Sequence, residues 1–156
     1  MIRPATPADA PAIADLFHQT VRRVNARDYT PAQVAAWAGP APDPGKWLGR
    51  QATRFTVVDE QHGVLRGFAE LQADGHLDAC YVSADHQRQG VGAALLHRIE
   101  AEACARGEHR LTTEASITAV AFFTARGWRV EAGQEVRYQG EIFQNFRMTK
   151  ALSAAS

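Results

Sequence analysis

The chain has 156 residues, of which 46% are hydrophobic and 22% are charged, a composition typical of one folded domain. Lys plus Arg and Asp plus Glu number 17 each, so the formal net charge is zero. A neutral chain has no broad electrostatic attraction to nucleic acids or anionic lipids, and we expect neither as a partner. We expect a single domain over residues 1–152 and a disordered tail at 153–156.

The chain contains two cysteines, Cys80 and Cys104, whose spacing fits neither a zinc site nor a disulfide framework. The N-terminal segment has prolines and acidic residues where a signal peptide needs an apolar run. No apolar stretch reaches the ~20 residues of a membrane span. These observations predict a cytoplasmic protein that holds no metal and enters no membrane.

The first predicted elements are a short strand at 2–6 and a long helix whose N-cap is Thr6. A second, shorter helix begins after Thr30, the next N-cap. A proline follows each cap, as is common at the first helical position. The segment 39–45, GPAPDPG, cannot continue a helix and is predicted to be a loop.

Strand-like runs separated by the turns EQHG and ADG predict an antiparallel meander of three strands over 54–82. A helix opened by Gly90, a strand at 110–116, a helix closed by Gly127 and two final strands follow. The fold class is therefore α/β (α+β), with a mixed, mostly antiparallel sheet of about seven strands flanked by about four helices. The helix after Gly90 is expected to join two parallel strands.

The stretch DHQRQGVGAALLHRIE (85–100) has a glycine pair, Gly90 and Gly92, between a strand and an amphipathic helix. Backbone N–H groups at a helix start form an anion site. A dinucleotide-binding loop needs a third glycine where this chain has Leu95, and the Gly-Lys-Ser/Thr of a P-loop is absent. From the glycine pair alone, a phosphate-binding loop and a tight turn without a ligand both stay open.

The run Gln87-Arg88-Gln89-Gly90-Val91-Gly92 resembles the pyrophosphate loop of the GNAT superfamily of N-acetyltransferases. The stretch SITAVAFFTARGW (116–128) is similar to the second signature of that family and lies at the expected distance. The predicted element order matches the family's fold over nearly the whole chain. The stretches YTPAQVAAWA, LDACYV, EASITAVAFF and GEIFQNFRMTKAL are further similar to a bacterial subgroup of the family.

The resemblance implies acetyl-CoA as cosubstrate. It also implies acetyl transfer to a primary amine of a small molecule or peptide, by direct attack in a ternary complex. N–H groups from Arg88 to Ala93 would hold the pyrophosphate, and the N–H of Val82 or of its neighbour would lie near the acetyl oxygen. The expected cofactor-binding residues are Tyr81, Val82, Gln87, Arg88, Gln89, Gly90, Val91, Gly92, Ala93, Ser116, Phe122 and Phe123.

Acetyl transfer to an amine needs a base for the ammonium and a proton for the departing thiolate. Asp78 is the first candidate base, Glu70 the second and Glu114 the third; for Asp78 and Glu70, a solvated carboxylate on the sheet is the alternative. Glu114 could instead orient an arginine or contact the substrate amine. His76 follows a turn and is expected at the surface.

Phe123 stands where many members of the family carry the tyrosine that protonates the thiolate. Tyr138 and Tyr81 are the remaining candidate donors, unless the thiolate leaves unaided. Ser116 suits a cofactor contact and a helix N-cap equally. An acyl-Cys80 intermediate is not expected, because no base is spaced to activate the thiol. The phenylalanine at position 123 is the only feature of the sequence that favours the alternative function, a non-catalytic acyl-CoA-binding sensor module.

The resemblance implies that the acceptor approaches between the first two helices and the last strands. That region contains Asn25, Tyr29, Trp37, Tyr138 and Phe143. Such an aromatic, weakly charged region suits a small amine or a peptide N-terminus better than a polyanion. A second copy of the chain, forming a homodimer, is the other partner left open.

Overall fold

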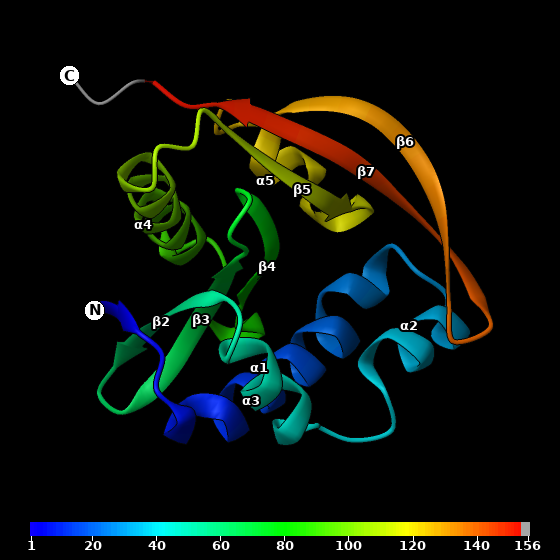
Figure 1. Cartoon of the computed structure of the whole chain (residues 1–156). Helices are drawn as coiled ribbons and strands as arrows, with labels where there is room; N and C mark the ends of the chain where they lie inside the picture. The colour runs from blue at the N-terminus through cyan, green and yellow to red at the C-terminus, as the bar shows by residue number, and fades with distance from the viewer. Residues whose placement is uncertain (154–156) are drawn as a thin grey trace.

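Seven strands and five α-helices make up residues 1–153, the part of the chain that the computed structural model describes (Figure 1). The strands are β1 (Ile2–Pro4), β2 (Phe55–Gln61), β3 (Val64–Leu71), β4 (His76–Val82), β5 (Arg110–Ser116), β6 (Arg129–Tyr138) and β7 (Glu141–Ala151). The helices are α1 (Ala10–Arg23), α2 (Pro31–Ala38), α3 (Pro44–Gln51), α4 (Val91–Ala105) and α5 (Val120–Thr124).

All the strands belong to one sheet, in the order β1-β2-β3-β4-β5-β7-β6. Neighbouring strands are antiparallel, except for β4 and β5, which are parallel and joined by α4. The sheet confirms the predicted fold class and the predicted parallel crossover. A disordered tail is expected at 153–156, and residues 154–156 of it lie outside the described residues.

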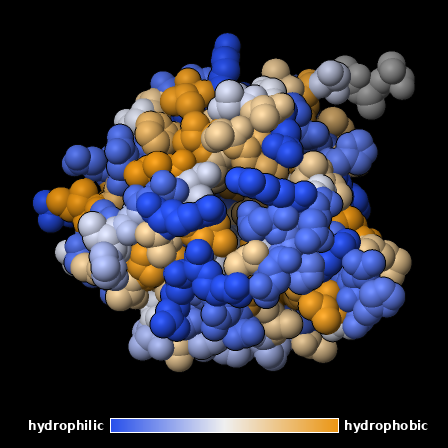
Figure 2. Space-filling model, turned by 180° about the vertical axis from the view of Figure 1, so that it is seen from behind, coloured by the Kyte–Doolittle hydropathy of each residue, from blue (hydrophilic) through white to orange (hydrophobic). Residues whose placement is uncertain are grey.

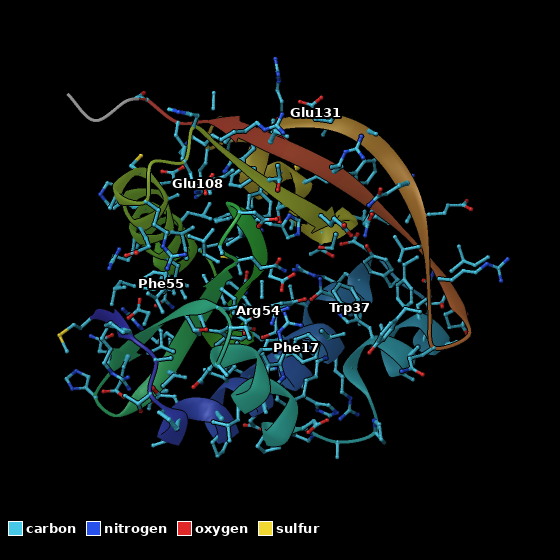
Figure 3. The ribbon with its side chains drawn as sticks, in the orientation of Figure 1. Phe17, Trp37, Arg54, Phe55, Glu108 and Glu131 are labelled. Atoms are coloured by element: carbon cyan, nitrogen blue, oxygen red, sulfur yellow. The ribbon has the colours of Figure 1, made fainter. Side chains whose placement is uncertain are left out.

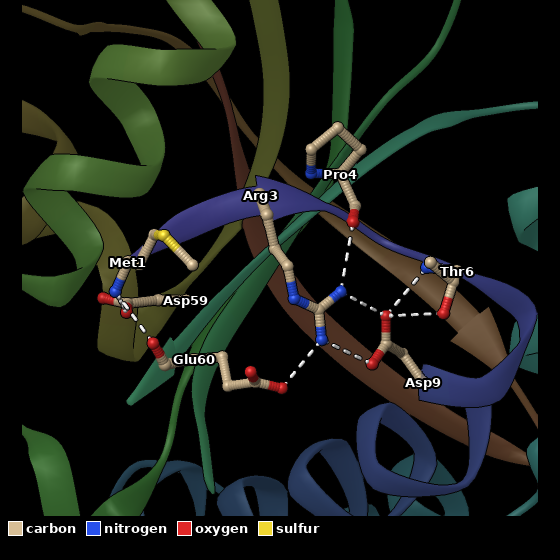
Figure 4. Close-up of polar contacts among 7 residues, drawn as sticks. All are labelled: Met1, Arg3, Pro4, Thr6, Asp9, Asp59 and Glu60. Carbon is tan, nitrogen blue, oxygen red and sulfur yellow. Dashed lines mark hydrogen bonds and ion pairs between the residues drawn. The ribbon is translucent and has the colours of Figure 1, made fainter. Parts of the chain in front are cut away.

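Thr6 caps a 3₁₀ turn (Pro7–Asp9) that runs directly into α1, so the predicted start is present, but the N-cap of α1 itself is Asp9. The N–H of Thr6 donates to the Asp9 carboxylate at 2.7 Å, and Arg3 donates two further hydrogen bonds to it, at 2.8 and 2.9 Å (Figure 4). Arg3 also pairs with Glu60 on β2 at 2.8 Å. These charge-assisted bonds connect β1, the start of α1 and β2.

The second predicted cap is also present, and an unexpected helix follows it. Gln33 N–H donates to the Thr30 hydroxyl at 3.1 Å, which opens α2. The predicted loop at 39–45 ends early, because Asp43 accepts the N–H of Lys46 at 3.2 Å and thereby caps α3. A proline at the first position of α3 favours this start.

Two apolar clusters cover the two faces of the sheet. One cluster contains Val91, Leu95 and Ile99 of α4 together with Phe123 and Trp128. The other contains Ile13, Phe17 and Val21 of α1, Val34 of α2 and Trp47 of α3. Helices α4 and α5 therefore pack on one face, and α1, α2 and α3 pack on the other.

Strands β4 and β5 pair only at their beginnings. His76 lies opposite Thr112 and Leu77 lies opposite Thr113, and beyond these two pairs the strands separate. Figure 1 shows β5 running away from β4 toward the segment that precedes α5. The sheet is thus open in the middle, where the family resemblance implies a gap for the pantetheine arm.

A β-bulge lies beside this gap. The register between β3 and β4 shifts next to Glu70, so that Asp78 is an extra residue on β4. Leu77 consequently packs in the cluster of α4, whereas Ala79 packs in the cluster of α1. Residues two apart in a regular strand share a face, so the bulge is what reverses the facing of β4 at this point.

The long hairpin of β6 and β7 arches across to α2 (Figure 1). The side-chain amide of Gln33 fixes this contact by donating to the carbonyl of Ile142 at 2.7 Å. The face of the molecule in Figure 2 is largely hydrophilic, with hydrophobic residues in separate groups. None of the helices within residues 1–153 has the length and apolar character to cross a membrane.

Candidate active site

The predicted pyrophosphate loop connects β4 to α4. Gly90 is the N-cap of α4, with φ of 81°, and no side chain caps the helix. The first hydrogen bond of the helix runs from Ala94 N–H to the Gly90 carbonyl, at 3.0 Å. The N–H groups of Val91, Gly92 and Ala93 therefore have no acceptor within the helix, and the positive end of its dipole lies there. This arrangement suits a phosphate group.

The two glycines of the loop are needed for different reasons. A Cβ atom on Gly90 would meet nothing within 4 Å, so its positive φ is what favours glycine. A Cβ atom on Gly92 would come within 2.8 Å of the Phe122 ring and 3.4 Å of the Val82 side chain. Gly92 thus allows α4 to pack closely against α5, in addition to any contact with a ligand.

The three polar residues before Gly90 differ in their roles. Gln87 donates to the carbonyls of Val82 (2.8 Å) and Ser83 (3.3 Å), which fixes the end of β4. Arg88 and Gln89 are exposed. Arg88 has φ of 60°, a left-handed conformation that costs a non-glycine residue roughly 1 kcal/mol or more. Such strain is common in ligand-binding loops.

The gap between β4 and β5 holds a cavity of about 190 Å³, which we call the donor cavity. Residues of both strands, α1 and the α5 region line it. Six of the expected cofactor-binding residues are among them: Tyr81, Val82, Gln87, Ser116, Phe122 and Phe123. The cofactor contacts of these residues and of residues 88–93 stay predictions.

The backbone of β4 offers a hydrogen-bond donor to the gap. Ser83 N–H donates to the carbonyl of Arg66 on β3 at 2.8 Å. Successive backbone groups of a strand point to opposite sides, so the N–H of Val82 faces β5. The Val82 carbonyl, on the same side, accepts from Gln87 (2.8 Å) and Thr20 (3.4 Å).

Ser116 is a helix cap. Its hydroxyl oxygen accepts the N–H of Ala119 at 3.2 Å and the side-chain amide of Asn25 at 3.5 Å. One of the two roles left open by the sequence is thereby confirmed. A contact between Ser116 and the cofactor stays a prediction.

A second cavity, of about 470 Å³, lies on the side of the sheet that α1, α2 and α3 cover; we call it the acceptor cavity. Seven aromatic residues line it: Phe17, Tyr29, Trp37, Trp47, Tyr81, Tyr138 and Phe143. Figure 3 labels Phe17 and Trp37 near the centre of the molecule, between the helices and the strands. Six residues line both cavities: Trp37, Asp78, Ala79, Tyr81, Glu114 and Ser116. The two cavities therefore meet at the bulge of β4.

Asp78 lines both cavities and is held by two arginines. Its carboxylate accepts from Arg50 at 3.1 Å and also pairs with Arg54, which Figure 3 labels beside this region. Burial raises the pKa of Asp78, but hydrogen bonds with Gln72 and Arg54 and the charge of Arg50 outweigh burial and lower it. Asp78 is consequently an ionised group that attracts cations.

Glu70 lies beneath the site and is fully buried (0% exposed). Arg50 donates to Oε1 at 2.9 Å, whereas Oε2 has no hydrogen-bond partner within residues 1–153. Burial raises the pKa of Glu70, and its pairing with Arg50 offsets only part of this effect. A raised pKa suits a general base, but Glu70 is not among the residues that line either cavity.

The remaining candidates lie at different depths. Glu114 lines both cavities, whereas His76 and Tyr138 line the acceptor cavity alone. Tyr138 is 44% exposed, at the end of β6. Cys80 lines the donor cavity, and burial raises its thiol pKa to about 12, which disfavours a nucleophilic thiolate.

The sequence interpretation missed the cations of the site. Lys46 and Arg50 of α3 line the acceptor cavity, and Arg54 follows the helix. The pair Asp43-Pro44 is a typical helix start and could have revealed α3. Lys46 and Arg50, four residues apart, would then share one side of that helix.

Comparison with known proteins agrees with this geometry. Residues 25–150 match the family described as "Acetyltransferase (GNAT) domain". The chain is 30% identical over 147 residues to the uncharacterized N-acetyltransferase YafP of Escherichia coli K12, covering 94% of this chain and 93% of that protein.

Solved structures give the same result. A GCN5-related N-acetyltransferase from Rhodopseudomonas palustris has a TM-score of 0.93 and 36% identity, over 97% of this chain and 95% of that one. A GNAT superfamily phosphinothricin acetyltransferase from Sinorhizobium meliloti, in complex with acetyl-CoA, shares the fold at a TM-score of 0.76 and 19% identity, over 100% and 90% of the two chains. By its family match and its relatives, the chain belongs to the GNAT family of acetyl-CoA-dependent acetyltransferases.

Proposed function

We propose that this acetyltransferase transfers the acetyl group to the primary amine of a small molecule or a peptide, by direct attack in a ternary complex. The observation that carries the proposal is the junction of the two cavities at Trp37, Asp78, Tyr81 and Glu114. Two substrates bound at once can meet there, without a covalent enzyme intermediate.

On the donor side, the chain supplies backbone groups rather than charges. The N–H groups of Val91, Gly92 and Ala93 bind the pyrophosphate at the start of α4. The N–H of Val82 faces the acetyl oxygen, where negative charge develops during attack. The S. meliloti relative, which has the same fold, is a complex with acetyl-CoA, which supports acetyl-CoA as the donor.

On the acceptor side, the aromatic walls favour an amine with an apolar or aromatic body. Aromatic rings bind such a body by burying its apolar surface and by stacking on it. Two carboxylates, Asp78 and Glu114, line the acceptor cavity where it meets the donor cavity, and the amine must reach the thioester there. A polyanion would meet these carboxylates, whereas Arg50 of the same cavity is already paired with Glu70 and Asp78, which leaves Lys46 as the cation for it among residues 1–153.

The two carboxylates have different roles toward the acceptor amine. Asp78, kept ionised by Arg50 and Arg54, attracts the ammonium group. Glu114 forms no ion pair among residues 1–153 and lines both cavities, so it takes the proton that the amine must lose. Glu70 acts through Arg50, whose guanidinium it holds in place by accepting a hydrogen bond.

Titration calorimetry with acetyl-CoA, followed by release of free thiol with a set of amines, tests the proposal. The set contains phenethylamine, tryptamine, a phenylalanine-initiated dipeptide and spermidine as the polar comparison. We expect binding, and faster thiol release with the aromatic amines than with spermidine. Binding without turnover of any amine would favour the alternative, a non-catalytic acyl-CoA-binding sensor. Absence of binding would contradict both functions.

Three further expectations accompany this function. Cys80 and Cys104 are free thiols in the structure, which suits the predicted cytoplasmic location, since disulfides form mainly in oxidising compartments. A homodimer also stays a prediction, which sedimentation of the purified protein would test. The neutral net charge disfavours nucleic acid as a partner.

A further inference from the structure

We infer that the hydroxyl of Tyr81 donates a hydrogen bond to the CoA sulfur as the thioester breaks, the task that Phe123 cannot perform. The inference rests on the proposed function and names a catalytic residue for it. Tyr81 is favoured over Tyr138, because Tyr138 lines only the acceptor cavity.

Tyr81 is the phenol at the junction of the cavities. Its ring is stacked on Phe68, with centroids 5.6 Å apart, and packs edge-on against Phe17 at 5.2 Å. Aromatic contacts on two sides hold the ring in one orientation. The sulfur must lie where the donor cavity meets the acceptor, and Tyr81 lines both sides of that point.

Most other polar side chains that line the donor cavity already donate within the protein. Thr113 donates to the Leu77 carbonyl at 2.8 Å, Thr20 and Gln87 donate to Val82, and Asn25 donates to Ser116. These protons stabilise the strand ends and are not available to a leaving group. The indole N–H of Trp37, which lines both cavities, donates to the phenol oxygen of Tyr81 itself.

Ser116, Thr118 and Cys80 remain as rivals. Ser116 is held as a cap by the two hydrogen bonds that its oxygen accepts. Thr118 lines only the donor cavity, away from the junction, and Cys80 does likewise. Tyr81 is the donor that combines a fixed ring with a place at the junction.

The state of the phenol agrees with this role. Burial raises the pKa of Tyr81, and the opposing effects of a hydrogen bond with Trp37 and of the charge of Arg50 are smaller. The phenol therefore keeps its proton throughout the physiological pH range and serves as a hydrogen-bond donor rather than as a base.

The step is balanced without a further reactant. The amine nitrogen forms a bond to the acetyl carbon, and the C–S bond breaks with its electron pair on sulfur. The O–H of Tyr81 stabilises the thiolate by a hydrogen bond. The proton lost by the nitrogen passes through Glu114 and solvent to the sulfur, so that amide and CoA thiol form and Tyr81 ends unchanged.

The test is Tyr81→Phe, alone and combined with Phe123→Tyr. Phenylalanine keeps the packing on Phe17 and Phe68, so we expect an unchanged thermal midpoint and an unchanged affinity for acetyl-CoA in calorimetry. Because the loss of one donor to a developing anion costs about 10²-fold, we expect kcat to fall by roughly that factor. A phenol returned at position 123 should restore kcat at least about 5-fold.

Three further measurements separate this role from structural effects. Phe143→Tyr in the Tyr81→Phe background is the matched control, because Phe143 lines the acceptor cavity but not the donor cavity, and it should not restore kcat. Ser116→Ala should lower kcat less than Tyr81→Phe does. An unchanged kcat in Tyr81→Phe, a loss explained by weaker acetyl-CoA binding, a loss that Phe123→Tyr leaves in place or equal rescue by Phe143→Tyr would each overturn the inference. Failure of the proposed function is distinct, because the wild-type protein would then turn over no amine.

Discussion

The ring of Phe122 lies so close to Gly92 that a Cβ atom on Gly92 would come within 2.8 Å of two ring carbons. Gly92→Ala should therefore push α4 away from α5 and destabilise the protein by about 1–3 kcal/mol, as overpacking does. Chemical denaturation measures this change. Gly49→Ala is the control, because a Cβ atom on Gly49 of α3 meets nothing within 4 Å. That variant should gain up to about 1 kcal/mol, and equal effects of the two substitutions would refute the packing account.

Asp78 and Glu114 can be separated by the kinetics of thiol release. If Glu114 takes the amine proton, Glu114→Gln should lower kcat by about 10²-fold or more. Asp78→Asn should instead raise the KM of the amine, because it removes the charge that attracts the ammonium. The opposite pattern would make Asp78 the base.

The buried Glu70 should make stability fall with rising pH. Below its ordinary pKa of 4.5 the group is protonated in the folded and the unfolded state alike. Because the folded pKa is raised, the unfolded state loses the proton first as pH rises, and wild-type stability decreases until the folded pKa is passed. Glu70→Gln removes this titration, so its stability relative to the wild type should increase from pH 4 upward. Denaturant unfolding at pH 4, 6 and 8 measures the difference, and a constant difference would contradict the raised pKa.

The parts of this fold that the sequence predicts are those fixed by local interactions. The caps at Thr6 and Thr30 each depend on residues within one helical turn. The glycine at 90 needs only its own backbone conformation. These features can be predicted because residues that are neighbours in the sequence determine them.

The remaining features depend on contacts between distant segments. Arg50 and Arg54 reach Asp78 only after α3 has packed on the sheet. The sequence of α3 begins in a stretch rich in proline and glycine, which is typical of a loop rather than of a helix. The different environments of Asp78 and Glu70 likewise come from burial and pairing, which no local pattern encodes. The order of the candidate bases could therefore not be settled from the sequence.

The central claim, that the loop before α4 binds the pyrophosphate of acetyl-CoA, is tested most directly by calorimetry on Gly90→Asp and Gly90→Asn. A side chain at this position has open space, and Asp and Asn tolerate a positive φ similarly, so the two variants differ mainly in charge. We expect Gly90→Asp to bind acetyl-CoA at least about 10-fold more weakly than Gly90→Asn, because its carboxylate faces the phosphates. Equal affinity of the two variants for acetyl-CoA would contradict the claim.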